Sequence, residues 1–72
     1  MGATTIKLEH TAQAETVRSR IRADYLEMPD LCVTVEEGAR FWHVDSEICR
    51  QALVQLAREG FIVCRGRKFA RR

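Results

Sequence analysis

The chain has 72 residues, of which 46% are hydrophobic and 31% charged, with a net charge of +2. This composition is typical of a globular chain, and the length allows one small domain with a thin core, since such chains bury only about 60% of their unfolded surface. No apolar run approaches the roughly 18 residues that a membrane span needs, and the amino terminus lacks the apolar region of a signal peptide. We therefore expect a cytoplasmic protein.

The charge is unevenly distributed along the chain. Residues 1–57 hold six basic and nine acidic side chains, whereas residues 58–72 hold six basic side chains and a single acid, Glu59. A basic terminal segment on a nearly neutral body is typical of proteins that contact a polyanion. Solvated surface is the alternative explanation for such a segment.

The three cysteines, Cys32, Cys49 and Cys64, are far apart and form no CxxC pair. A disulfide framework or a structural zinc site normally requires an even set or closely spaced ligand pairs, so we expect neither. We expect buried, reduced thiols that act as small hydrophobic groups. We also expect no enzymatic activity and no cofactor. A catalytic Cys–His pair needs two side chains that converge, and the sequence does not require any histidine to lie near these thiols.

The first half of the chain predicts a flexible segment, a helix and a short strand. Residues 1–10 lack helical periodicity and predict a flexible amino terminus, with a short strand as the alternative. Residues 11–26 predict a helix, because one apolar stripe recurs at helical spacing. The helix should end before Pro29, and residues 31–33, "LCV", predict a small strand. The stripe consists of Ala14, Val17, Ile21 and Tyr25.

The second half predicts two helices and a hairpin. "TVEE" from Thr34 has the form of a capping box, and the helix that follows must turn at His43, a residue type that tolerates positive φ. Asp45 can cap the next helix, which should end at Gly60. "FIVC" and "KFA" then predict a β-hairpin around Gly66. The inward face of the last helix is Ile48, Cys49, Ala52, Leu53 and Leu56.

The order of these elements, and the segment "TVEEGARFWHVDSEICRQALVQLAREGFIVCRGRKF", resemble the winged helix-turn-helix family of bacterial DNA-binding domains, especially GntR-like and related small regulators of bacterial, phage or plasmid origin. The resemblance implies an α+β, mainly helical fold: three helices, a short strand and a carboxy-terminal hairpin wing, in one domain over residues 11–72. Two positions depart from the family pattern. His43 stands at the turn position that is usually glycine, and Val54 stands where a charged side chain is frequent.

The resemblance also implies sequence-specific binding of double-stranded DNA by a small transcriptional regulator. The helix of residues 45–59 would enter the major groove, where Arg50 can pair with guanine, Gln51 with adenine, and Glu47 with cytosine. The wing of residues 61–70 would contact the backbone or minor groove. The implied DNA-binding residues are Ser46, Glu47, Arg50, Gln51, Arg58, Arg65, Arg67 and Lys68.

Each of these residues also has a purely structural interpretation. Asp45 and Glu47 stabilise the start of a helix whether or not DNA is present. Arg50 and Gln51 can be plain solvated surface, and Phe41 and Trp42 are more typical of packing between helices than of base stacking. Arg71 and Arg72 are expected to be a flexible tail.

A winged helix that docks a partner protein is the alternative function, favoured by the acids on the last helix and by Val54. If DNA is the ligand, a homodimer would match the spaced half-sites that specific DNA sites commonly present. The sequence does not indicate the DNA target or whether the regulator activates or represses transcription. It also identifies no effector and no small-molecule substrate.

Overall fold

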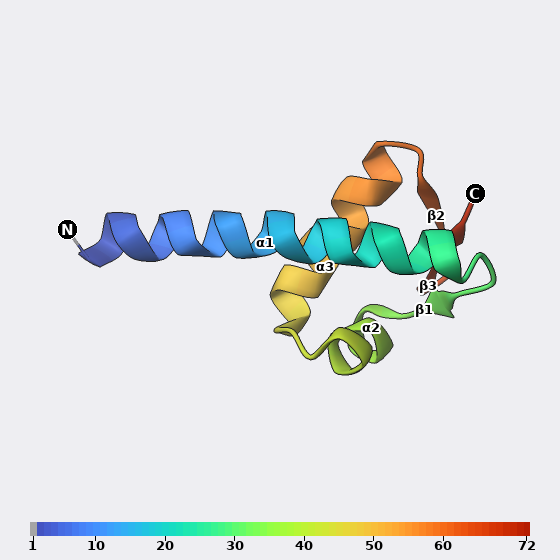
Figure 1. The fold of residues 1–72 in the computed structure, drawn as a ribbon. Coiled ribbons are helices and arrows are strands. Elements are labelled where there is room, and N and C mark those ends of the chain that lie inside the picture. Colours follow the sequence, from blue (N-terminus) through green and yellow to red (C-terminus); the bar gives the residue numbers. More distant parts are fainter. Residues whose placement is uncertain (1) are drawn as a thin grey trace.

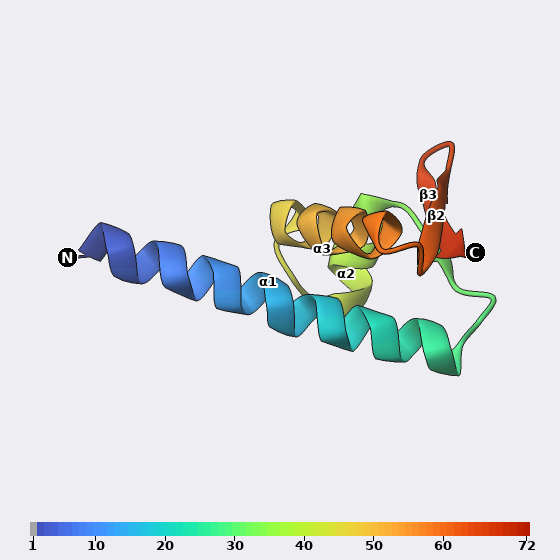
Figure 2. The ribbon, with the colours of Figure 1, turned by 90° about the horizontal axis from the view of Figure 1, so that it is seen from above.

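A computed structural model describes the backbone of residues 2–72 and the side chains of residues 14–72. The chain forms three helices and a three-stranded antiparallel sheet, a small and mainly helical α+β fold, as the sequence predicts (Figure 1). The molecule is elongated, with extents of 43 × 20 × 20 Å. The length comes from α1, whose amino-terminal part lies away from the other elements in both ribbon views (Figures 1 and 2).

Helix α1 spans Gly2–Glu27 and is longer than the sequence predicts. Its expected start was residue 11, so the expected helix is confirmed and continues through the segment predicted to be a flexible terminus or a strand. The predicted apolar stripe is correct. Val17, Ile21 and Tyr25 are buried, and Ala14 packs against the same core. The helix ends just ahead of Pro29, where the ring prevents continuation.

Strand β1, Cys32–Val33, leads directly into α2, Val35–Trp42. The predicted capping box is present, because the Thr34 hydroxyl accepts from the Glu37 amide and the Glu37 carboxylate accepts from the Thr34 amide. These two bonds satisfy backbone donors that no intrahelical carbonyl can reach. The helix ends at His43, whose φ of 55° lies in the left-handed region, as predicted for this turn.

Helix α3 spans Ser46–Arg58 and begins with the predicted cap, since the Asp45 carboxylate accepts from the Glu47 amide at 3.0 Å. The five residues predicted for its inward face are all buried. Close contact with α2 depends on Gly38. A Cβ at this position would lie 2.7 Å from a ring carbon of Trp42 and 3.0 Å from the Cys49 sulfur, so a larger residue does not fit.

The predicted hairpin consists of β2, Ile62–Arg65, and β3, Lys68–Arg71, with Gly66 in its turn at a φ of 65°. The sheet order is β1-β3-β2, so β1 pairs with β3 although residues 34–67 lie between the two strands. Val33 lies opposite Phe69 in this pairing, and both are buried. The small strand therefore fixes the hairpin to the start of α2.

Side-chain bonds from Arg18, Asp24 and Tyr25 join the described part of α1 to the rest of the fold. The Tyr25 hydroxyl donates to the Phe69 carbonyl at 2.6 Å, and the Trp42 indole N–H donates to Asp24 at 2.6 Å. Arg18 pairs with Glu59 at 3.0 Å, just beyond the last residue of α3. Helix α1 is therefore bonded to the hairpin, to α2 and to the residue that follows α3.

The prediction that all three thiols are buried is wrong for two of them. Cys49 is fully buried, whereas Cys32 and Cys64 are exposed on β1 and β2. Both exposed cysteines lie in strands of four residues or fewer. Such strands show too little alternation for the sequence to indicate which face is buried.

Candidate functional site

All eight residues that the sequence proposes for DNA contact are exposed. Four of them lie on the outer face of α3 and one at its end, and the remaining three surround the hairpin turn. Figure 2 shows α1 on one side of α3 and the hairpin turn pointing away from α1. The start of α3 and the hairpin turn therefore form a surface that α1 does not cover.

A groove of about 550 Å³ lies between α2, α3 and the hairpin. It brings together four of the proposed residues, because Ser46, Glu47 and Arg50 line it from α3 and Arg67 lines it from the hairpin turn. Glu36 at the start of α2 adds a second acid. The groove is completed by Val35, Val54, Cys64 and Phe69.

Charges within this groove are balanced. Two carboxylates, Glu36 and Glu47, lie with two guanidinium groups, Arg50 and Arg67. A balanced groove attracts a polyanion only weakly through net charge, so the excess positive charge at this surface comes from cations outside it. Those cations are Arg58 at the last turn of α3 and the hairpin residues Arg65 and Lys68.

Glu47 organises the side chains at the start of α3. Its carboxylate accepts from Arg50 through both oxygens, with Nε at 3.3 Å from Oε1 and Nη2 in contact with Oε2. The side-chain Nε2 of Gln51 also donates to Oε2 at 3.3 Å. The hydrogen bond and the charge of Glu47 raise the pKa of Arg50, which stays protonated at any accessible pH. The sequence does not predict this network, although its i, i+3 and i, i+4 spacings are those that bring helix side chains together.

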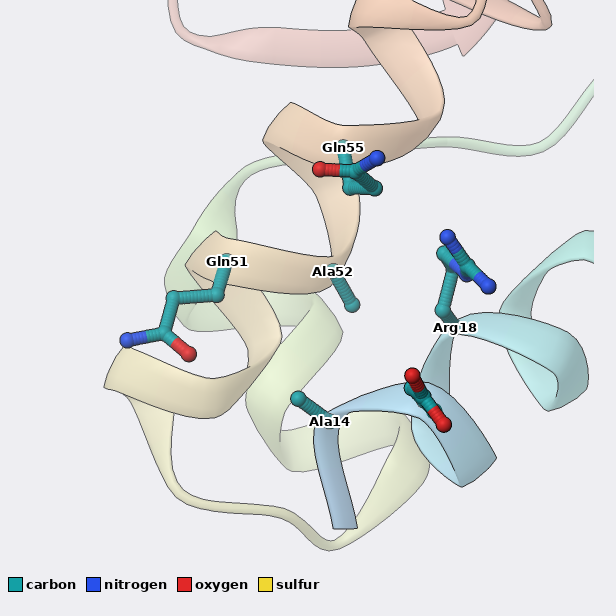
Figure 3. A pocket seen from close by; sticks show the side chains of 6 residues that line it. Ala14, Arg18, Gln51, Ala52 and Gln55 are labelled. Atoms are coloured by element: carbon teal, nitrogen blue, oxygen red, sulfur yellow. The ribbon is translucent and has the colours of Figure 1, made fainter. Parts of the chain in front are cut away.

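Gln51 lies apart from the groove. It lines a second, smaller hollow of about 310 Å³ between α3 and α1 (Figure 3). In that view Ala52 and Gln55 of α3 face Ala14 and Arg18 of α1. The expected pairing of Gln51 with adenine beside Arg50 therefore requires its side chain to leave Glu47 and turn toward the groove.

The end of the chain is folded, which corrects the expectation of a tail at Arg71. This residue belongs to β3, and its guanidinium lies 4.5 Å from the centroid of the Phe61 ring. Arg22 of α1 approaches the same ring at 5.1 Å. Phe61 is thus in contact with two cations, an arrangement typical of cation–π attraction. Arg71 belongs to the packing of the hairpin rather than to a free basic tail.

The two aromatic residues at the end of α2 have different environments. Trp42 is buried and bonded to Asp24, so its ring is part of the core as the structural interpretation predicts. Phe41 is 49% exposed and packs edge-on against Trp42 at 5.4 Å. Neither residue lines the groove.

Two findings bear on metal-ligating and thiol side chains. Within residues 14–72 no three His, Cys, Asp or Glu side chains gather closely enough to hold a metal ion. Cys49 is buried, and burial raises the pKa of its thiol to about 11, which disfavours the reactive thiolate.

The comparisons with known proteins gave no match, whether to a protein-family model, a curated protein or a solved structure. No helix in the described part of the chain is both long and apolar enough to cross a membrane.

Proposed function

We propose that this protein binds double-stranded DNA as a winged helix and acts as a small transcriptional regulator. In this proposal the outer face of α3 enters the major groove, and the hairpin turn contacts the backbone or the minor groove. One observation carries the proposal: an exposed helix face whose side chains can hydrogen-bond to bases lies across one groove from a turn with three cations.

Helix α3 has the form that major-groove reading requires. The major groove of DNA admits an α-helix, and the first turns of such a helix supply side chains to the base edges. Ser46, Glu47 and Arg50 occupy the first two turns of α3, and all three are exposed. Val54 follows one turn later in the same groove and can contact a thymine methyl.

The hairpin has the form that phosphate contact requires. Arg65, Arg67 and Lys68 surround Gly66 within four consecutive residues, and all are exposed. Cations at such a turn release counterions from DNA and supply affinity without reading the sequence. Because the groove itself is charge-balanced, the hairpin would supply most of the attraction and α3 most of the discrimination.

A winged helix that docks another protein is the second candidate function. The observation that favours it is the composition of the groove. Its lining includes the side chains of Val35, Val54 and Phe69, with the two acids and two arginines balanced around them. Interfaces between proteins commonly combine an apolar centre with a polar rim that carries arginine.

Amide chemical-shift mapping separates the two functions. Titrating labelled protein with a duplex should shift the amides of residues 46–51 and 65–68 most strongly, because the proposal places these backbone segments against DNA. Replacing Arg65, Arg67 and Lys68 together by Ala should abolish the shifts on both segments. Shifts confined to α1, or shifts of the triple variant equal to those of the wild type, would contradict DNA reading by this face.

A further inference from the structure

We infer that Arg50 reads a guanine and that Glu47 is the positioning residue that orients Arg50 for this contact. The inference rests on the DNA-binding function proposed above and specifies the base pair that the start of α3 selects. It assigns Glu47 a role in discrimination through Arg50, in place of direct contact with cytosine.

Glu47 uses one edge of the Arg50 guanidinium. The carboxylate receives the Nε–H and one hydrogen of Nη2. A guanidinium carries five N–H groups in a fixed plane, so the two hydrogens of Nη1 and the second hydrogen of Nη2 are not used in these bonds. The edge formed by Nη1 and Nη2 is then available for a second bidentate partner.

Guanine presents the acceptor pair that fits this edge. Its O6 and N7 both accept in the major groove, and arginine pairs with them bidentately in the commonest specific protein–DNA contact. Adenine offers an acceptor beside a donor, and cytosine offers a donor, so neither matches two parallel N–H groups. An arginine held along its Nε side by a carboxylate therefore discriminates in favour of guanine.

The charge of the pair supports a role in discrimination. Glu47 neutralises Arg50, so the pair adds little to attraction for phosphates. An unpaired arginine at this exposed position would be free to contact a phosphate or any base acceptor. Bonding to Glu47 limits the rotamers available to Arg50, and this restriction lowers the entropy that the side chain would lose on binding a base.

Glu36 provides a matched control for charge. It lines the same groove from the first turn of α2, and it is exposed like Glu47. Arg50 donates two hydrogen bonds to Glu47. Glu36→Gln therefore removes one negative charge from the groove and leaves the bonds to Arg50 in place.

The test is selection of binding sites from a library of duplexes with a randomised central segment, performed in parallel with wild-type protein and with E47Q, E36Q, R50K and R50A. Wild-type protein and E36Q should select a guanine at one position by about tenfold or more over other bases. R50K and R50A should lose this preference. E47Q should reduce this preference without abolishing it and should bind unselected duplex as well as the wild type or better, because a negative charge has been removed.

The negative results of this selection contradict different parts of the proposal. If the wild-type protein binds no duplex, the proposed function and this inference both fail. If duplexes are bound but E47Q retains the guanine preference of the wild type, the positioning role of Glu47 is overturned. If no selected guanine depends on Arg50, the reading role of Arg50 is overturned while DNA binding stands. Equal losses in E47Q and E36Q would assign the effect to charge and would also overturn the positioning role.

Discussion

The hydroxyl of Tyr25 donates a buried hydrogen bond of 2.6 Å to the carbonyl oxygen of Phe69, which lies 44 residues further along the chain. This bond joins the last turn of α1 to the middle of the hairpin. The position of the hairpin relative to α3 therefore depends on α1 as well as on the pairing of β1 with β3. A surface that combines α3 with the hairpin needs such a connection.

Tyr25→Phe should destabilise the fold by about 1–2 kcal/mol. The variant keeps the ring, which packs against Trp42 and Phe61, and loses only the hydroxyl. A buried carbonyl that loses its donor is costly because water cannot replace the bond. Urea unfolding of the variant and the wild type measures the difference, and equal midpoints with equal slopes would show that the bond contributes nothing.

Gly38→Ala should destabilise the protein by about 1–3 kcal/mol, the usual cost of overpacking a core. In most helix interiors the same change stabilises by up to about 1 kcal/mol, so the expected sign is reversed here. The reason is the 2.7 Å approach that a Cβ would make to Trp42. Thermal unfolding provides the measurement, with Glu36→Ala on the same helix as an exposed control. A higher melting temperature for Gly38→Ala would contradict the close packing of the Trp42 ring against Gly38.

The stability of His43 variants should depend on backbone strain at this position and not on contacts of the side chain. With a φ of 55° this exposed residue occupies a region that glycine adopts without steric cost. His43→Gly should leave stability unchanged or raise it by up to about 1 kcal/mol, whereas His43→Val should lower it by more than about 1 kcal/mol. Chemical denaturation of both variants checks the order. A valine variant as stable as the glycine variant would exclude strain at this turn.

Alkaline pH should destabilise the protein through its buried core. Burial raises the pKa of the Cys49 thiol from 9.0 to about 11, and burial, followed by nearby thiols, raises the pKa of the Tyr25 hydroxyl. The unfolded chain therefore releases these protons first. The stabilisation due to neutral Cys49 is complete below pH 9 and is lost as the pH rises toward 11, a loss of up to about 3 kcal/mol.

Cys49→Ala provides the comparison for this pH dependence. Its free energy of unfolding should be lower than that of the wild type at pH 7, because a buried side chain has been truncated, and it should fall less steeply between pH 9 and 11. Denaturation at a series of pH values gives both slopes. Parallel curves for the two proteins would contradict the raised pKa of Cys49.

Much of the fold could be predicted from local sequence signals. The capping box at Thr34, the turn at His43 and the inward face of α3 depend on residues within one or two helical turns of each other, and all are confirmed. The extension of α1 to Gly2 could not be predicted, because the first ten residues lack an apolar stripe. The pairing of β1 with β3 could not be predicted either, since it joins strands far apart in sequence.

The candidate surface was predictable in its position but less so in its detail. Periodicity places Arg50 and Gln51 outside the core, and both are exposed. Helical spacing alone does not indicate that Glu47 bonds to both residues. The side chains of Arg50 and Gln51 each have several rotamers, and only some of these bring them to Glu47. The separation of Gln51 from the groove depends on how α1 crosses α3, which is a tertiary relationship (Figure 3).

The salt dependence of duplex binding tests the central claim most directly. Binding of a labelled duplex, followed by fluorescence anisotropy over a range of salt concentrations, should give a log–log slope of about −3. This value corresponds to roughly three or four phosphate contacts from the hairpin cations and Arg58. Lys68→Ala should reduce the slope by about one. A slope near zero, or a slope unchanged when the hairpin cations are removed, would contradict DNA binding by this surface.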